Sequence, residues 1–141
     1  MLRPQVGRKA VVLVSDGNDY GSRVDVEEAI AEAQKSDLII YGVRYFDREF
    51  YYRSGGLGGN GFSQLKKLSR ATGGGVFEVT RKRPLDEILE TINDEIRNQY
   101  SIGYTPKRDL SQKGFREIEV RAKGKSYEVQ AREGYYPEAL L

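Results

Sequence analysis

An apolar run near the N-terminus constrains the fold more than any other feature of this chain. It extends from Ala10 to Val14 (AVVLV) and stops at Ser15-Asp16-Gly17. A short apolar run bounded by charge and by a turn is typical of a strand buried on both faces of a parallel α/β sheet. Because such sheets bind ligands at the carboxyl ends of their strands, Asp16 is expected at a binding edge. Asp-Gly is also a common turn dipeptide, so Asp16 could instead cap the next helix.

Strand and helix patterns alternate three times over the first hundred residues. Residues 38–43 and 76–79 repeat the pattern of a buried strand, and each strand is followed by apolar residues at helical spacing. Repeats of this kind imply parallel strands joined by crossover helices. We therefore expect an α/β fold, three-layered and Rossmann-like, over residues 8–99. The predicted helix boundaries are a capping box at Ser22 and Asp25, an end at Gly73 and a start at Pro84.

The hydrophobic period changes from helical to alternating at about residue 100. Apolar residues alternate with small or charged ones in residues 100–104, 118–122 and 127–131. This period is typical of antiparallel strands with one solvent-facing side. We expect a C-terminal antiparallel β-hairpin or meander over residues 100–137. Because no low-complexity linker separates the two halves, residues 1–141 are expected to form a single domain.

Composition limits the chemistry that this chain can perform. The sequence contains no His and no Cys, and its formal net charge is +2. Any metal must then be held by oxygen ligands, and acid–base catalysis would need carboxylates, Lys or Tyr. A net charge so close to zero disfavours nucleic acid as a partner. The sequence also contains no long apolar run, which predicts that the chain has no membrane span.

A long loop over residues 44–56 interleaves aromatic and basic side chains. Tyr and Arg are enriched at protein-binding hot spots, and long irregular loops in compact domains are usually functional or disordered. We expect this loop to bind a protein partner, although its rings could instead pack against the sheet while its arginines face water. The predicted partner-binding residues are Arg44, Tyr45, Phe46, Arg48, Phe50, Tyr51, Tyr52 and Arg53.

Several segments, taken in order, resemble the second half of a von Willebrand factor A domain. They are the strand ending in SDG, the strand DLIIYGVRYF, the segment LKKLSRATGGGVFEV and the helix leading into IRNQYSIGYTP. The trailing FREIEVRAKGKSYEVQAREGYYP is similar to the strand extension of a bacterial subgroup, the von Willebrand factor A-related proteins. The resemblance implies a Mg²⁺ site at the sheet edge that an acidic residue of the partner completes. Asp16 carries over to that site, and Asn18 and Asp19 are weaker neighbouring candidates.

The chain departs from the family pattern at its main metal motif. Asp-x-Ser-x-Ser, which supplies most of the family's ligands, is absent, so we expect a fragment that begins at the family's fourth strand. One carboxylate with water binds Mg²⁺ weakly. The strand from Ala10 to Val14 would also lose a neighbour, and an exposed apolar edge recruits other strands. We expect this edge to be covered by the C-terminal hairpin or by a second copy of the chain in a homodimer.

Three functions are compatible with these features. The first is a non-enzymatic module for protein–protein interaction or adhesion, with a residual cation site at Asp16. The second is a small metal-assisted hydrolase or phosphoryl-binding domain that uses Asp16 and Asp19, although such chemistry needs several convergent carboxylates. The third is a truncated gene product without independent function. The resemblance implies an extracytoplasmic location as part of a longer chain, while the N-terminal segment MLRPQVGRKA does not have the pattern of a signal peptide.

Overall fold

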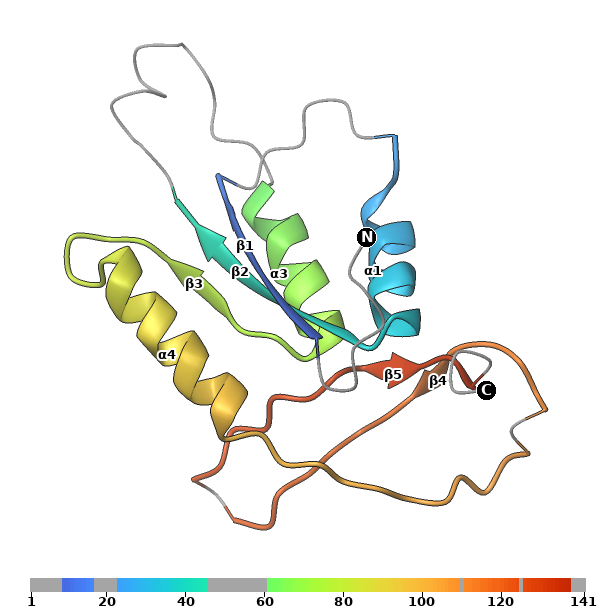
Figure 1. Cartoon of the computed structure of the whole chain (residues 1–141). Helices are drawn as coiled ribbons and strands as arrows, with labels where there is room; N and C mark the ends of the chain where they lie inside the picture. The colour runs from blue at the N-terminus through green and yellow to red at the C-terminus, as the bar shows by residue number, and fades with distance from the viewer. Residues whose placement is uncertain (1–8, 17–22, 46–60, 110, 125, 138–141) are drawn as a thin grey trace.

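Two sheets and three helices make up the structure, a computed structural model that describes residues 9–16, 23–45, 61–109, 111–124 and 126–137 (Figure 1). The first three strands form a parallel sheet in the order β1-β2-β3, and the last two form a separate antiparallel pair. The predicted parallel α/β part is therefore confirmed. In chain order the elements are β1 (Lys9–Ser15), α1 (Val26–Lys35), β2 (Leu38–Arg44), α3 (Gly61–Thr72), β3 (Val76–Glu78), α4 (Leu85–Arg97), β4 (Arg116–Glu117) and β5 (Gly134–Tyr135).

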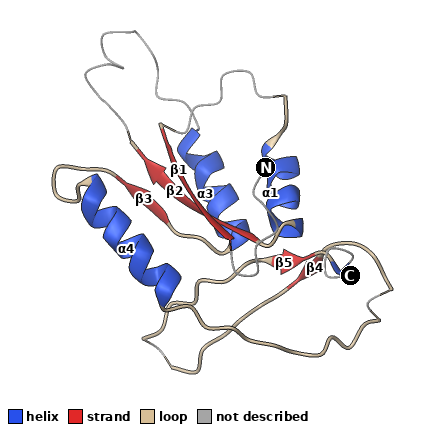
Figure 2. Ribbon diagram, in the orientation of Figure 1, coloured by secondary structure: helices blue, strands red, loops and turns tan. Residues whose placement is uncertain are grey.

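Helices cover both faces of the central strand β2, as Figure 2 shows. Successive side chains of a strand point to opposite faces, so Tyr41 and Val43 share one face while Gly42 lies on the other. The first pair packs with Phe77 of β3 and with residues of α4 to form the buried core. On the opposite face, a Cβ at Gly42 would lie 2.7 Å from the Cγ of Leu65 in α3. The absence of a side chain at Gly42 therefore allows α3 to approach the sheet closely.

Local sequence signals set the helix ends. Asp25 is the N-cap of α1, and its Oδ1 accepts a hydrogen bond of 2.7 Å from the backbone N–H of Glu28. The predicted capping box placed this boundary at Ser22, three residues too early. Asp25 is the N-cap instead, because its backbone is extended and its own carboxylate accepts a hydrogen bond from the first helical turn. Helix α3 ends before Gly73, whose positive φ of 83° is the left-handed conformation expected after a helix.

The predicted burial of the first strand on both faces is wrong. Strand β1 lies at the edge of the sheet, and the exposed fractions of Val12, Leu13 and Val14 are 36%, 38% and 46%. Val12 and Val14 are in register with Tyr41 and Val43, so they share the sheet face on which α4 packs. The core on that face is built from β2, β3 and α4, and no described helix extends it over β1. An apolar sequence therefore faces solvent here.

In the C-terminal half, the structure contains only a short antiparallel pair of strands, which adjoins two of the predicted strands. Strands β4 and β5 pair over two residues each, and Ile118 extends the pairing through a hydrogen bond of 2.9 Å to the carbonyl of Glu133. The expected strands over residues 100–104, 118–122 and 127–131 have no assigned strand structure. Figure 1 shows that the chain beyond the short pair spreads into two separate arms: an outgoing arm after β4, residues 118–124, and a returning arm before β5, residues 126–133. The predicted coverage of the β1 edge by a C-terminal hairpin is also wrong, because β4 pairs with β5 and not with β1.

Contacts with the α/β part explain why the arms separate. The returning arm is tied to it by an ion pair of 2.8 Å between Arg132 Nη1 and Asp37 Oδ1, and by a hydrogen bond of 3.1 Å from Gln130 Nε2 to the carbonyl of Gly73. The backbone N–H of Glu133 donates to the carbonyl of Ala71 at the end of α3. These contacts hold one arm against the helical layer, away from the outgoing arm. In the described part of the chain, no helix has the length and hydropathy needed to cross a membrane, in agreement with the prediction.

Candidate functional site

The carboxyl ends of the parallel strands form a rim on which three of the predicted site residues lie: Asp16, Arg44 and Tyr45. Strand register places Ser15 beside Arg44 and Arg44 beside Glu78, so β1, β2 and β3 end at the same edge. The backbone N–H of Tyr45 donates a hydrogen bond of 2.9 Å to the carbonyl of Ser15. Asp16 and Tyr45 are therefore the first residues after two paired strands, and their backbones lie side by side.

Arg44 is held in position by neighbours on the rim. Its Nη1 lies 3.3 Å from the Oε1 of Glu78, and its guanidinium carbon lies 5.0 Å from the centre of the Phe62 ring. Both contacts come from elements that flank the end of β2, so the charge of Arg44 is balanced within the rim. Tyr45, in contrast, is 54% exposed and presents its ring to solvent. Of these two residues, Tyr45 is the one whose side chain is accessible to a partner.

Asp16 is the only predicted metal-binding residue within the described part of the chain. It is partly exposed, and the hydroxyl of Ser15 lies 3.5 Å from its Oδ1, so a carboxylate and a hydroxyl oxygen stand together. Among the described residues, no three acidic side chains gather in a group that could hold a metal ion. The other predicted site residues lie outside the described residues; they are Asn18, Asp19, Phe46, Arg48, Phe50, Tyr51, Tyr52 and Arg53.

The open edge of β1 begins at this rim and gives the site a second component. The carbonyl of Ser15 accepts a hydrogen bond from Tyr45, so the backbone of Ser15 points toward β2. In a parallel ladder, alternate residues direct both backbone groups to the same side. The backbones of Ala10, Val12 and Val14 therefore point away from β2, toward the side on which no described strand pairs. The family resemblance implied that β1 loses a neighbour at this edge, but the expectation was that the edge is covered, by the C-terminal hairpin or by a second copy of the chain.

A cavity of about 980 Å³ is a feature that the sequence predictions did not include. It lies between the two C-terminal arms, the start of β2 and the end of α4. The sequence signal for it was the alternation of apolar residues in the segment after α4 and in the outgoing arm. The alternating residues that line the cavity there are Tyr100, Ile102, Tyr104, Ile118, Val120 and Ala122. The alternation was interpreted as an antiparallel β-hairpin or meander with one solvent-facing side. Because the arms stand apart, the same side chains surround a space instead.

Tyr41 connects the cavity to the core. Its ring is buried in the core cluster, and its hydroxyl accepts a hydrogen bond of 3.4 Å from Gln99 Nε2. Burial raises the pKa of Tyr41 above its ordinary value, and the nearby carboxylate of Glu95 adds to this rise, while the hydrogen bond from Gln99 opposes it. The Tyr41 hydroxyl is therefore held in its neutral form at one end of the cavity.

Comparison of the chain with protein-family models, with curated proteins and with solved structures finds no match. The functional interpretation therefore depends on the geometry of the rim, of the β1 edge and of the cavity.

Proposed function

We propose that this chain is a non-enzymatic protein-interaction module that binds its partner by strand addition to the open edge of β1. The observation that carries the proposal is the outward direction of the backbone groups of Ala10, Val12 and Val14 on an apolar edge strand. Exposed edges of this kind are templates for another strand, and main-chain hydrogen bonds supply the affinity. The lack of His and Cys in the sequence agrees with a binding role rather than a catalytic one.

Strand β1 is complementary to a second copy of itself. The partner that we propose is therefore a second copy of this chain, which gives a homodimer. In an antiparallel pair centred on Val12, Val12 faces its own copy and Ala10 faces Val14. All three residues direct their backbone groups outward, so each would form a hydrogen-bonded pair. Lys9 would face Ser15 rather than another lysine, which avoids like-charge repulsion. A two-fold axis of this kind gives a closed, self-complementary interface.

The rim would lie beside such an interface and could extend it. Asp16 follows directly on β1, and Tyr45 is exposed on the neighbouring strand end. The sequence resembles the second half of a von Willebrand factor A domain, and in that family the corresponding edge binds partners through a cation. A cation at Asp16 would be held weakly unless the partner adds a carboxylate.

Molar mass measured by light scattering tests this function. We expect the wild-type chain to form a dimer that dissociates on dilution. The variant Val12→Lys should be monomeric, because it places two ammonium groups opposite each other at the centre of the pair. Val24→Lys is the matched control, because Val24 lies before α1, outside β1, and 48% of its surface is exposed. The dimer should also slow amide hydrogen exchange at Ala10, Val12 and Val14.

Two results would contradict the proposal. The first is a wild-type chain that stays monomeric at high concentration while the outward amides of β1 exchange freely with solvent. The second is a dimer that Val12→Lys leaves as stable as Val24→Lys does, which would place the interface elsewhere.

A further inference from the structure

The cavity between the C-terminal arms has the size and the lining of a small-molecule site. Its volume of about 980 Å³ lies at the upper end of the range for pockets that bind drug-sized ligands. Apolar side chains from the outgoing arm, the returning arm and the start of β2 form most of its wall. The cavity is separate from the β1 edge, so an inference about it does not depend on the proposed dimer.

The charged groups that line the cavity are predominantly acidic. Asp37, Glu95 and Glu128 contribute carboxylates, whereas Arg132 is the only basic residue among the described residues that line it. Arg132 already forms an ion pair of 2.8 Å with Asp37. Two carboxylates are then left without an internal counter-charge in the lining. An anionic ligand would meet net repulsion here, and a cation would meet net attraction.

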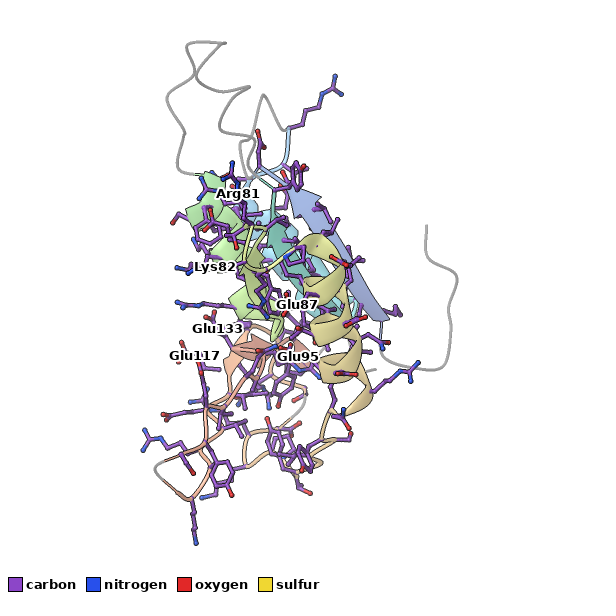
Figure 3. All side chains as sticks on the ribbon, turned by 90° about the vertical axis from the view of Figure 1, so that its left-hand side faces the viewer. Arg81, Lys82, Glu87, Glu95, Glu117 and Glu133 are labelled. Carbon is purple, nitrogen blue, oxygen red and sulfur yellow. The ribbon has the colours of Figure 1, made fainter. Side chains whose placement is uncertain are left out.

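Glu95 is the carboxylate best placed to act on a bound ligand. It is half-buried near the C-terminal end of α4, and its Oε2 accepts a hydrogen bond of 3.3 Å from Gln130 Nε2. No salt bridge to Glu95 is present among the residues that the structure describes. Figure 3 shows Glu95 at the end of α4 next to the C-terminal arms, whereas Glu87 lies farther up the same helix. A partly desolvated carboxylate attracts a cation more strongly than one in bulk water does.

Aromatic rings complete the lining. Each has a negative face that attracts cations within about 6 Å of the ring centre, and cages of such rings recognise quaternary ammonium groups. The rings of Tyr104 and Tyr135 meet edge to face with their centres 6.4 Å apart, so they form one corner of the wall. Tyr100 is 90% exposed and is not one of the buried core residues. The five tyrosines of the lining are Tyr41, Tyr100, Tyr104, Tyr127 and Tyr135.

We propose that this cavity binds an organic cation with an apolar body, such as a quaternary ammonium or phosphonium compound. The positive centre lies against Glu95 and the tyrosine rings, and the apolar body contacts the alternating side chains of the arms. A neutral apolar ligand would fill the same space but would leave Glu95 without a counter-charge. Binding of the cation adds a partner for that carboxylate, which is the reason for the selectivity.

A pair of ions of nearly equal shape and opposite charge tests the proposal. Isothermal titration calorimetry with tetraphenylphosphonium should give a Kd in the micromolar range for the full chain. Tetraphenylborate, which presents the same four phenyl rings around a negative centre, should bind at least about tenfold more weakly. The comparison separates charge selectivity from simple hydrophobic binding.

Two variants connect the selectivity to named residues. Glu95→Gln should weaken phosphonium binding by at least about fivefold, the smallest effect of a carboxylate in contact with a cation in water. Glu87→Gln is the matched control, because Glu87 is exposed on the same helix and does not line the cavity. Tyr100→Ala should weaken binding about threefold or more through loss of a ring contact. Because Tyr100 is 90% exposed, this substitution removes no buried core side chain.

Three results would overturn the proposal. They are the absence of phosphonium binding, binding of tetraphenylborate as tight as or tighter than that of the phosphonium, and a Kd that Glu95→Gln leaves unchanged. The last result would show that the tyrosines or the apolar wall bind the ion without the carboxylate.

Discussion

The hydrogen bond between Thr72 and the backbone of Ile40 joins α3 to the central strand, and its removal tests the interior of the fold. The Oγ1 of Thr72 accepts a hydrogen bond of 3.0 Å from the N–H of Ile40, and both residues are buried. The same hydroxyl donates locally to the carbonyl of Ser69 at 3.0 Å. Thr72→Val keeps the shape of the side chain but removes the acceptor, so the buried N–H of Ile40 loses its partner.

The expected cost follows from that lost partner. A buried donor left unsatisfied destabilises a protein by about 1–3 kcal/mol. For a chain of this length, each kcal/mol lowers the melting temperature by roughly 3–4 °C. Thr72→Val should therefore melt about 3–12 °C below the wild type. The extra methyl group offsets little of this, because the site is already packed between α3 and β2.

Ser69→Ala is the matched control from the same helix. Ser69 is fully buried, and its Oγ has no hydrogen-bond partner among the described residues. Replacing a buried hydroxyl that forms no hydrogen bond should change the free energy of unfolding by less than about 1 kcal/mol, or stabilise the fold slightly.

Thermal and urea unfolding followed by circular dichroism measure both variants. The reasoning is refuted if Thr72→Val melts with the wild type, or if Ser69→Ala loses as much stability as Thr72→Val does. The first result would mean that the N–H of Ile40 loses this acceptor at no measurable cost. The second would mean that the loss of a buried hydroxyl, and not the orphaned N–H of Ile40, determines the cost.

Two further predictions concern pH and metal. The pKa of Tyr41 is raised in the folded state, chiefly by burial. Its contribution to stability is therefore present below about pH 10 and is lost as the pH rises through the folded pKa. Measured by urea unfolding, Tyr41→Phe should lose less stability than the wild type between neutral and strongly alkaline pH, and an equal loss in both proteins would contradict the assignment. Because Asp16 and Ser15 provide few oxygen ligands, millimolar Mg²⁺ should raise the melting temperature by no more than about 1 °C relative to chelator, and Asp16→Ala should abolish even that. A larger rise that persists in Asp16→Ala would place a metal site at other residues.

Residues whose role depends on near neighbours in the sequence were predicted well. Helical spacing predicted an apolar stripe on α4 made of Leu85, Ile88, Leu89, Ile92 and Ile96. Ile88 and Ile92 are in the core and Leu85 packs against it, whereas Leu89 and Ile96, at the margin of the stripe, are 42% and 39% exposed. Gly73 marked the end of α3, because few other residues adopt a positive φ without strain. The apolar runs predicted three parallel strands, and the register between them confirms that part of the fold.

The candidate site could be predicted only in part. The sequence placed Asp16 directly after a strand, and the structure places it at the carboxyl edge of the sheet beside Tyr45. It did not reveal that Arg44 is held by Glu78 and Phe62, because these contacts join residues from separate elements. The cavity was missed for a related reason, since a wall built from two arms depends on how far apart those arms stand.

What the sequence by itself determined is which side chains share a face and where most elements begin and end, because helical and strand periods depend only on local spacing. What the tertiary structure decided is which of those faces are covered. The apolar strand β1 is exposed because the core that α4 completes extends over β2 and β3, and the alternating C-terminal segments line a cavity because contacts near Gly73 and Asp37 hold one arm away from the other. Periodicity orients a side chain, but only the packing of distant segments removes it from water.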